Sequence, residues 1–204
     1  TFDCVGTIVF TSELVITADV IIIGGGDIIF DGDNRTRFFT VNEDKSLTLN
    51  GLTLQNGFAS YAGAIATEWK TTLTISNCTF LNNSVSNPEP SFNERMGGSA
   101  IYNAGKMTIR NSTFSGNSGD GGAIFNHATD VTITNSTFSD NPNGAIVNNY
   151  YGWGSVTISD STFINNSAEN GGAIANGDMA ITNSIFTGNS ATNSGGAIST
   201  YGWV

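Results

Sequence analysis

One short phrase recurs six times along this chain, and that repetition limits the possible folds more than any other feature. In a typical copy, "VTITNSTFSDNP", a segment of alternating apolar residues is followed by Thr-Phe and then by small polar residues. The copies begin at residues 47, 73, 107, 131, 156 and 179, at intervals of 23 to 34 residues. A second phrase, small–Ala–Ile, lies between them at 62–65, 98–101, 121–124, 143–146, 171–174 and 195–198. Such a period predicts a solenoid of stacked units.

The pattern within each unit predicts strands. Val131 and Ile133 alternate with Thr132 and Thr134, and a period of two is typical of a strand with one buried face. Glycine, asparagine and β-branched residues are too dense for helices. Each unit of about 24 residues holds three stretches of three to five residues between turn residues. We therefore predict an all-β, three-sided parallel β-solenoid of about eight coils, spaced about 4.8 Å apart.

Stacking of such units places equivalent side chains above one another. A first interior row is predicted from Phe80, Phe114, Phe138, Phe163 and Phe186. A second contains Ile75, Ile109, Ile133, Ile158 and Ile181. A third contains Ile65, Ile101, Ile124, Ile146, Ile174 and Ile198. At one corner we expect a row in which each amide donates to one neighbour and accepts from the next: Asn83, Asn117, Asn141, Asn166 and Asn189.

Composition narrows the possible partners. The 204 residues include 17 acidic and 7 basic side chains, so a nucleic-acid partner is not expected, because phosphates require basic residues. Apolar runs are too short for a membrane helix, so no membrane insertion is expected. The two cysteines, Cys4 and Cys78, lie about three repeats apart, which favours two separate small residues over a disulfide.

Two sets of residues carry a more specific resemblance. The paired "GGAI" and "FxxN" phrases resemble the repeats of chlamydial polymorphic outer-membrane proteins, whose passengers are surface adhesins, and those of bacterial right-handed parallel β-helix repeat proteins. The opening "TFDCVGTIVFTSELVITADVIIIGGGDIIFDG" resembles the first coils of the latter group. The resemblance implies a right-handed parallel β-helix at the cell surface or outside the cell. Since the matching motifs are structural, it implies little about activity.

The chain is interpreted as one β-solenoid domain spanning residues 1–204. Divergent coils occupy 1–46 and the repeats occupy 47–204. A loop excursion is predicted at 84–97, where Pro88 and Pro90 would prevent strand pairing. The chain starts and stops without a recognisable capping segment. We therefore expect its end coils to stack head to tail on another copy, or to continue into a longer parent chain.

Aromatic residues after the small–Ala–Ile strands are the first candidate contact site. If the coils are in register they lie along one edge: Trp69, Tyr150, Tyr151, Trp153, Tyr201 and Trp203. Exposed aromatic rows can stack on sugars or pack against a partner protein, and they can also fold back as a satellite core. Asn34 and Asn82 lie near loops within N-x-S/T sequences and are the candidate glycosylation sites.

No catalytic constellation is apparent. The outward row predicted at the end of the first strand has no carboxylate: Asn50, Ser76, Arg110, Thr134, Ser159 and Thr182. Asp130 and Asp178 are interpreted as turn residues, and so are Asp31 and Asp33 of "FDGDNRT". His127, the one histidine, is predicted to lie alone in a surface turn, so no metal or other cofactor is expected.

The sequence therefore predicts a non-catalytic extracellular or cell-surface module, structural or adhesive. Its expected partner is a second copy or the rest of a parent chain, with a host-surface or glycan ligand as a further candidate. The alternative function is a carbohydrate-active enzyme, of the polysaccharide lyase or hydrolase kind, or a glycan-binding module. Three carboxylates close together in one groove would favour the hydrolase.

Overall fold

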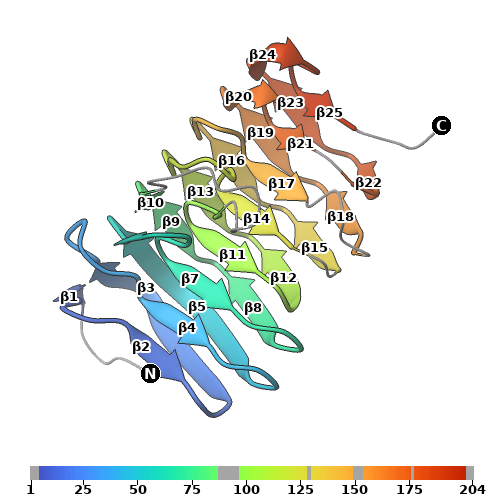
Figure 1. Ribbon diagram of the computed structural model, residues 1–204. Coiled ribbons are helices and arrows are strands. Elements are labelled where there is room, and N and C mark those ends of the chain that lie inside the picture. Colours follow the sequence, from blue (N-terminus) through green and yellow to red (C-terminus); the bar gives the residue numbers. More distant parts are fainter. Residues whose placement is uncertain (1–4, 87–96, 128–129, 149–153, 176, 201–204) are drawn as a thin grey trace.

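The computed structural model describes residues 5–86, 97–127, 130–148, 154–175 and 177–200. Within these ranges the chain forms only strands and turns, and it winds into a stack of coils (Figure 1). One coil contains β12 (Lys106–Arg110), β13 (Thr113–Ser115) and β14 (Ile124–Asn126), and all three pair in parallel with their counterparts in the next coil. The predicted three-sided solenoid is therefore confirmed.

The remaining strands fall into sets that share a side of the stack. The first side is formed by β3 (Val20–Asp31), β5 (Ser46–Gln55), β8 (Thr72–Ser76), β12, β15 (Val131–Thr134), β18 (Val156–Ser159) and β22 (Met179–Thr182). The second side consists of the later parts of β3 and β5 together with β9 (Thr79–Leu81), β13, β16 (Thr137–Ser139), β19 (Thr162–Ile164) and β23 (Ile185–Thr187). The first strand, β1 (Gly6–Val9), pairs with the later part of β3.

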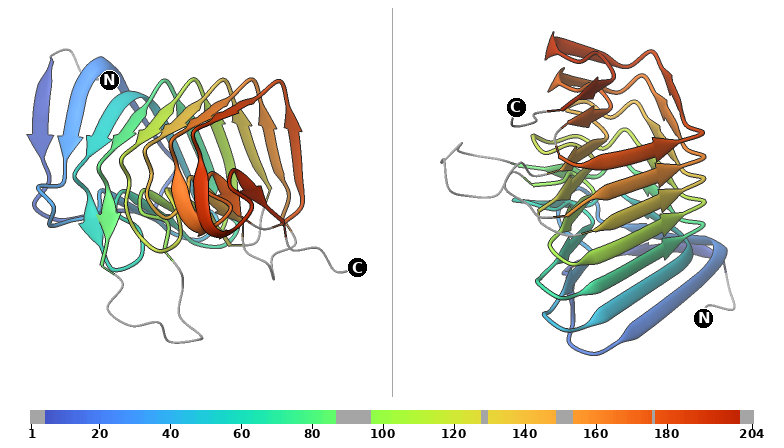
Figure 2. Two further views of the ribbon diagram at one scale, coloured as in Figure 1. Left: turned by 90° about the horizontal axis from the view of Figure 1, so that it is seen from above. Right: turned by 90° about the vertical axis from the view of Figure 1, so that its right-hand side faces the viewer.

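The third side is a separate sheet of eight strands, which corresponds to about seven turns of the solenoid. Its strands are β2 (Leu14–Ile16), β4 (Phe39–Val41), β7 (Ile65–Thr67), β11 (Ile101–Asn103), β14, β17 (Ile146–Asn148), β21 (Ile174–Ala175) and β25 (Ile198–Ser199). Two short pairs complete the fold: β6 (Phe58–Ala59) with β10 (Ser84–Val85), and β20 (Ser167–Asn170) with β24 (Ser190–Ser194). Figure 2 shows the coils as a regular row.

The three predicted apolar rows form the interior. Neighbouring phenylalanine rings of the first row stack with centroids 4.6 to 4.9 Å apart and planes within 8° of parallel, from Phe80 through to Phe186. Both isoleucine rows keep one register from coil to coil. Most of these side chains have no exposed surface at all. Their burial is the main favourable term for the fold.

Polar side chains also stack in rows, including the predicted asparagine row. In that row each amide nitrogen donates to the amide oxygen of the next coil, at 2.8 to 3.2 Å, from Asn83 to Asn189. A second buried row was not predicted, and it consists of Asn103, Asn126 and Asn148 on the third side. Its sequence signal is the repeated "AIYN", "AIFN" and "AIVN", in which Asn follows the buried isoleucine by two positions. These bonds satisfy polar groups that would otherwise be costly to bury.

The bend between the first and second sides explains other asparagines. Asn77, Asn111 and Asn135 have φ of 47° to 53°, a left-handed conformation that asparagine tolerates better than most residues. Their side-chain amides link successive coils, as in the bond from Asn111 Nδ2 to Asn77 Oδ1 at 3.3 Å. A serine row lies beside them, and Cys78 occupies the serine position in its coil: the Cys78 amide donates to Ser112 Oγ at 3.1 Å.

Two expectations about the strands are wrong. Strands β3 and β5 have 12 and 10 residues, not three to five, because they continue across the bend between the first and second sides. The glycines at 24–26 shift the register within β3 without ending it. The start predicted for the excursion at 84–97 is also too early, since Ser84 and Val85 form β10, which pairs with β6. Residues 87–96 lie outside the described ranges.

Candidate functional site

The outer face of the third sheet carries an unexpected apolar row. Ala66, Tyr102, Phe125, Val147 and Ala175 alternate with the inward side chains of their strands and align from coil to coil. An outward row of a solenoid is normally exposed, yet these side chains are all buried and form a second hydrophobic cluster. The outer face of this sheet therefore has a satellite core of its own.

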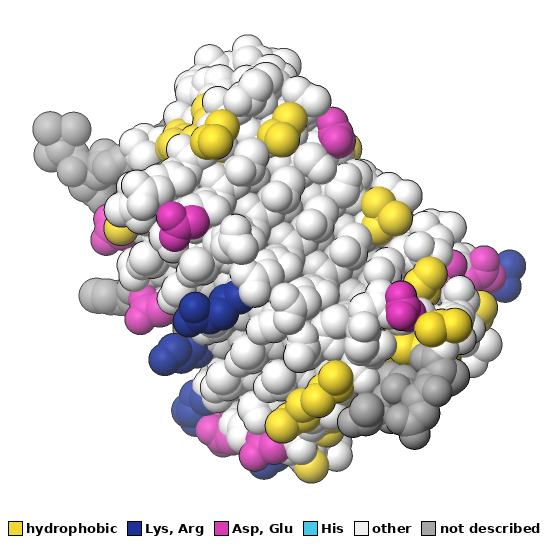
Figure 3. All heavy atoms as spheres, turned by 180° about the vertical axis from the view of Figure 1, so that it is seen from behind, with side chains coloured by type: hydrophobic (Ala, Val, Ile, Leu, Met, Phe, Trp, Pro, Cys, Tyr) yellow, Lys and Arg dark blue, Asp and Glu magenta, His cyan; other side chains and the backbone are white. Residues whose placement is uncertain are grey.

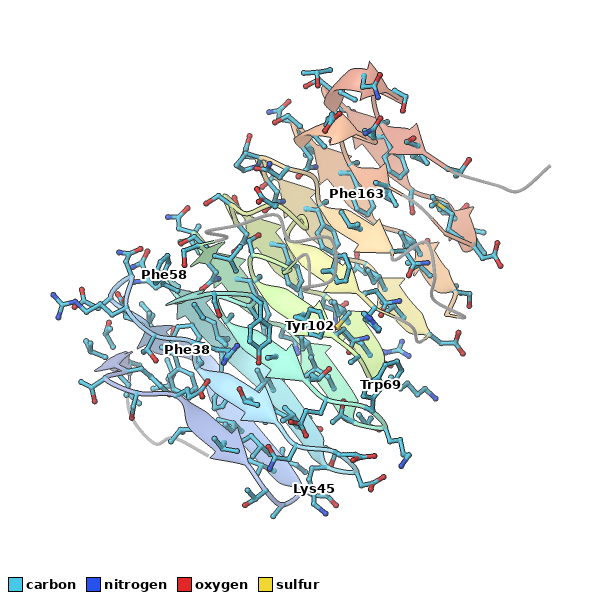
Figure 4. All side chains as sticks on the ribbon, in the orientation of Figure 1. Phe38, Lys45, Phe58, Trp69, Tyr102 and Phe163 are labelled. Carbon is cyan, nitrogen blue, oxygen red and sulfur yellow. The ribbon has the colours of Figure 1, made fainter. Side chains whose placement is uncertain are left out.

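A groove of about 310 Å³ lies beside this cluster, across the coils of β4, β7 and β11. It is lined by three aromatic rings, two carboxylates, two threonines and two alanines: Tyr61, Trp69, Tyr102, Glu43, Glu68, Thr40, Thr67, Ala66 and Ala104. Figure 4 labels Tyr102 on β11 and Trp69 in the turn between β7 and β8. A groove with a few aromatic and polar groups is the usual form of a small-ligand site.

The three rings of the groove differ in how much of their surface is available. Tyr102 is buried, with its ring stacked on Phe125 at 5.8 Å, and it meets Tyr61 edge to face at 5.7 Å. The guanidinium of Arg37 lies 4.6 Å above the ring of Tyr61. Trp69, by contrast, is 51% exposed. The indole is therefore the ring of this groove with the most surface open to a ligand.

The two carboxylates are held in place by neighbouring coils. Glu68 Oε2 accepts from the backbone nitrogen of Glu43 at 2.9 Å, and Glu43 Oε1 forms an ion pair with Lys70 Nζ at 2.8 Å. The hydrogen bond with Glu43 raises the pKa of Lys70 above its ordinary value. These contacts fix both acids as hydrogen-bond acceptors at the edge of the groove.

Arg37 supports the groove from the side of Tyr61. Its Nε donates to Glu13 Oε2 at 2.8 Å, and the same oxygen accepts from Thr40 Oγ1 at 3.2 Å. The side chain is only 10% exposed. Its Nη1 is buried and has no hydrogen-bond partner among the described residues. Arg37 therefore supports Tyr61 through the contact with its ring, and the ion pair with Glu13 holds the guanidinium in place.

The structure describes one of the six aromatic residues of the predicted contact site, whose ligand stays a prediction. Trp69 lies on the surface and lines the groove, while Tyr150, Tyr151, Trp153, Tyr201 and Trp203 lie outside the described residues. The prediction for His127 is wrong: its ring is partly buried and meets Trp69 edge to face at 5.2 Å and Tyr102 at 6.0 Å. Sequence reasoning missed Tyr102 and Phe125, because the strand pattern indicates only which residues point inward, and it missed Tyr61, which lies outside the strands.

The acids singled out in the sequence serve as turn and capping groups. Asp31 Oδ1 accepts from the backbone nitrogen of Asp33 at 2.9 Å, and Asp33 has φ of 50°, as expected for a turn. Asp130 Oδ1 accepts from the backbone nitrogen and the hydroxyl of Ser155 in the next coil, both at 3.1 Å. The hydrogen bond from the backbone nitrogen of Ser155 is the largest of the effects that lower the pKa of Asp130. Asp178 directly precedes β22, the position that Asp130 has before β15.

The face of the molecule that lies behind the view of Figure 1 is uncharged over most of its area (Figure 3). The predicted outward row from Asn50 to Thr182 is in register there, with Arg110 as its one charged member. Within the ranges that the structure describes, no three of His, Cys, Asp and Glu are placed to hold a metal ion. No helix in those ranges could span a membrane.

The two ends of the described stack form a further candidate surface. Ile8 and Leu14 occupy the register positions of the buried Phe30 and Phe39, yet they are 40% and 50% exposed. At the other end the side chains that continue the interior rows are only partly buried: Met179, Ile181, Phe186 and Ile198. Both described end coils therefore leave interior apolar surface open.

Asn34 and Asn82 are both exposed turn residues, with φ of 54° and 52°. Their modification stays a prediction. Cys78 is buried with a free thiol, and Cys4 lies outside the described residues.

The fold and its rows define a parallel β-helix repeat protein. Residues 19–203 match the family model described as a right handed beta helix region, and the chain belongs to that family. No curated protein and no solved structure matches the chain.

Proposed function

We propose that this chain is a non-catalytic β-solenoid of the cell surface or the extracellular medium, structural or adhesive, whose coils stack end to end on those of a second copy. The observation that carries the proposal is the exposure of interior positions in the two described end coils, above all Leu14 and Ile8 at one end. The surface location rests on the resemblance of the repeats to those of surface passengers.

The two end coils offer each other the same kind of contact that joins successive coils within the stack. Each interior rung consists of apolar side chains over apolar side chains, with parallel backbone pairing between them. A further coil placed over Leu14 or over Ile198 would repeat that contact. Covering one such side chain completely is worth about 1.5 to 3 kcal/mol. Edge strands with free backbone groups add a tendency to recruit another strand.

A contact between two different ends is heterologous, so it leaves one end of each kind available and propagates. The expected product is a filament of stacked coils with no fixed length. A contact between two equal ends would instead close after two copies. The two geometries therefore make different predictions for variants that block one end.

The test is sedimentation velocity with electron microscopy, for the unaltered chain, Leu14→Lys and Ile198→Lys. Head-to-tail stacking predicts filaments for the unaltered chain and monomers for both variants, because either charge removes one half of every contact. Thr132→Lys is the matched control: it adds the same charge to an outward position in the middle of the stack and should leave assembly unchanged.

Circular dichroism of each variant shows whether it still folds. Monomers of the unaltered chain at every concentration would overturn the stacking proposal. Loss of assembly in Leu14→Lys alone, with dimers persisting in Ile198→Lys, would overturn the head-to-tail geometry.

A further inference from the structure

We propose that the groove beside Trp69 binds a neutral oligosaccharide, with one sugar ring stacked on the exposed indole and its hydroxyls donating to Glu43 and Glu68. The groove crosses the coils of β4, β7 and β11, and its lining contains no residue of β2 or β25, the end strands of the third sheet. The inference is therefore independent of end-to-end assembly.

Trp69 has the position and support of a stacking platform. It is half exposed, and the imidazole of His127 meets it edge to face at 5.2 Å and 87°, which restrains the indole from one side. The turn that carries it is also restrained, because Thr71 Oγ1 donates to the carbonyl of Glu68 at 2.8 Å. A ring held in place before binding loses little freedom when a ligand arrives.

The polar groups of the groove match sugar hydroxyls. Both carboxylates accept hydrogen bonds, and charged acceptors form stronger bonds than neutral ones. Each carboxylate is held by a neighbouring coil, Glu68 by the backbone nitrogen of Glu43 and Glu43 by Lys70. Each carboxylate has two oxygens and about four acceptor sites, of which these contacts use one oxygen. An apolar platform beside fixed acceptors suits a ligand that has one apolar face and a rim of hydroxyls.

A quaternary ammonium ligand fits less well, although the groove contains three aromatic rings. An aromatic cage needs several ring faces directed at one cation. Tyr102 is buried, and the guanidinium of Arg37 already lies over the ring of Tyr61. Trp69 is therefore the one ring of the groove with a large open area, which provides a platform and not a cage.

An acidic sugar is also disfavoured. Glu43 and Glu68 would lie next to its carboxylate, and the chain carries a formal net charge of -10. Like charges placed next to each other disfavour binding. The observations therefore favour an uncharged saccharide over a uronate polymer.

The experiment is titration calorimetry of the whole chain with neutral hexasaccharides of β-1,4-linked glucose, xylose and N-acetylglucosamine. A hexagalacturonate and choline serve as the charged probes. We expect at least one neutral hexasaccharide to bind and both charged probes to fail. Trp69→Ala should raise the Kd for the neutral ligand at least ten-fold, equivalent to about 1.4 kcal/mol. Trp69→Phe, which keeps an aromatic face, should raise it less.

Ile185→Ala is the matched control, since Ile185 is 60% exposed and lies on β23, away from the groove. Its Kd should equal that of the unaltered chain. Circular dichroism and the urea midpoint identify variants that have lost their fold, and Trp69→Phe keeps the test decisive if Trp69→Ala unfolds.

Three outcomes would overturn the inference. They are the absence of neutral-sugar binding at millimolar ligand, binding that survives Trp69→Ala, and binding of choline or hexagalacturonate in preference to the neutral sugars. Since the groove and the ends are altered by different substitutions, failure here would leave the stacking proposal standing.

Discussion

The side-chain oxygen of Asn141 accepts two hydrogen bonds from Asn117 in the neighbouring coil. One comes from the backbone nitrogen at 3.0 Å and the other from Nδ2 at 3.2 Å. Asn141 Nδ2 in turn donates to the carbonyl of Phe114 and to Asn166 Oδ1. Both asparagines have no exposed surface. The pair therefore satisfies buried backbone and side-chain groups at once.

Replacing Asn141 with alanine should be strongly destabilising. The substitution leaves the backbone N–H and one of the two Nδ2 N–H groups of Asn117 without an acceptor, while Nδ2 keeps its bond to the Phe80 carbonyl, and each lost acceptor costs about 1 to 3 kcal/mol. We expect the free energy of unfolding to fall by about 2 to 6 kcal/mol, as measured by urea titration. Asn189→Ala is the control at the partly exposed end of the same row, where water replaces the lost acceptor and the cost should be about 1 kcal/mol. Equal losses for both variants would contradict this explanation of the row.

Two glycines with similar φ angles should respond differently to alanine. Gly25 and Gly171 have φ of 69° and 60°, and an alanine with positive φ costs about 1 kcal/mol. A Cβ on Gly25 would meet nothing within 4 Å, whereas one on Gly171 would overlap the carbonyl oxygen of Ile174. Urea titration should therefore show a loss of about 1 kcal/mol for Gly25→Ala and about 2 to 4 kcal/mol for Gly171→Ala. The explanation fails if Gly25→Ala is the more harmful change.

Asp31 should make stability fall in acid. Burial by itself would raise its pKa, but hydrogen bonds from Gln55, the Asp33 backbone and Asn56 outweigh burial and hold the pKa below its ordinary value of 3.8. Because the folded-state pKa is the lower one, the stabilisation is complete above about pH 5 and is lost as the pH falls through the folded-state pKa. The stability difference between the unaltered chain and Asp31→Asn should therefore shrink below the ordinary pKa in urea titrations. A difference that stays constant from pH 6 to about pH 2.5 would contradict this role.

The thiol of Cys78 should be unreactive in the folded chain. Burial raises its pKa, so little thiolate forms at neutral pH. In a Cys4→Ser background, a thiol-specific reagent at pH 8 should label Cys78 only after urea is added. Cys78→Ser should change the free energy of unfolding by less than about 1 kcal/mol, because the hydroxyl takes the position that Ser112, Ser136 and Ser161 occupy in later coils. Rapid labelling without urea would show that the site opens readily.

The interior of this fold could be predicted from the sequence because a parallel stack admits one register. Displacing a coil by one residue would bring Thr132 inward in place of Ile133, and every rung would then bury hydroxyls. The repeated phrases therefore determine both the strands and their alignment. The length of β3 was not predicted, since the sequence alone does not reveal that Gly25 and Gly26 absorb a register shift inside one strand of 12 residues.

The groove was much less predictable. Trp69 could be identified as an exposed aromatic residue, but His127 meets it from a turn 58 positions later, and that proximity depends on how the turns fold. Tyr102 and Phe125 occupy outward positions, where the alternation predicts exposure. Their burial depends on tertiary packing over the sheet, which the repeat does not encode.

The in-register coils also determine how the molecule would respond to force. Strand pairing and the interior rows join each coil only to its immediate neighbours, so a force between the two ends passes through every coil-to-coil contact in series. Tension applied at the ends should detach the outermost coil first and then the next. Each step would release about 24 residues, up to about 80 Å of extended chain. A rod of this kind would lengthen under strain in near-equal increments while its middle coils kept their shape.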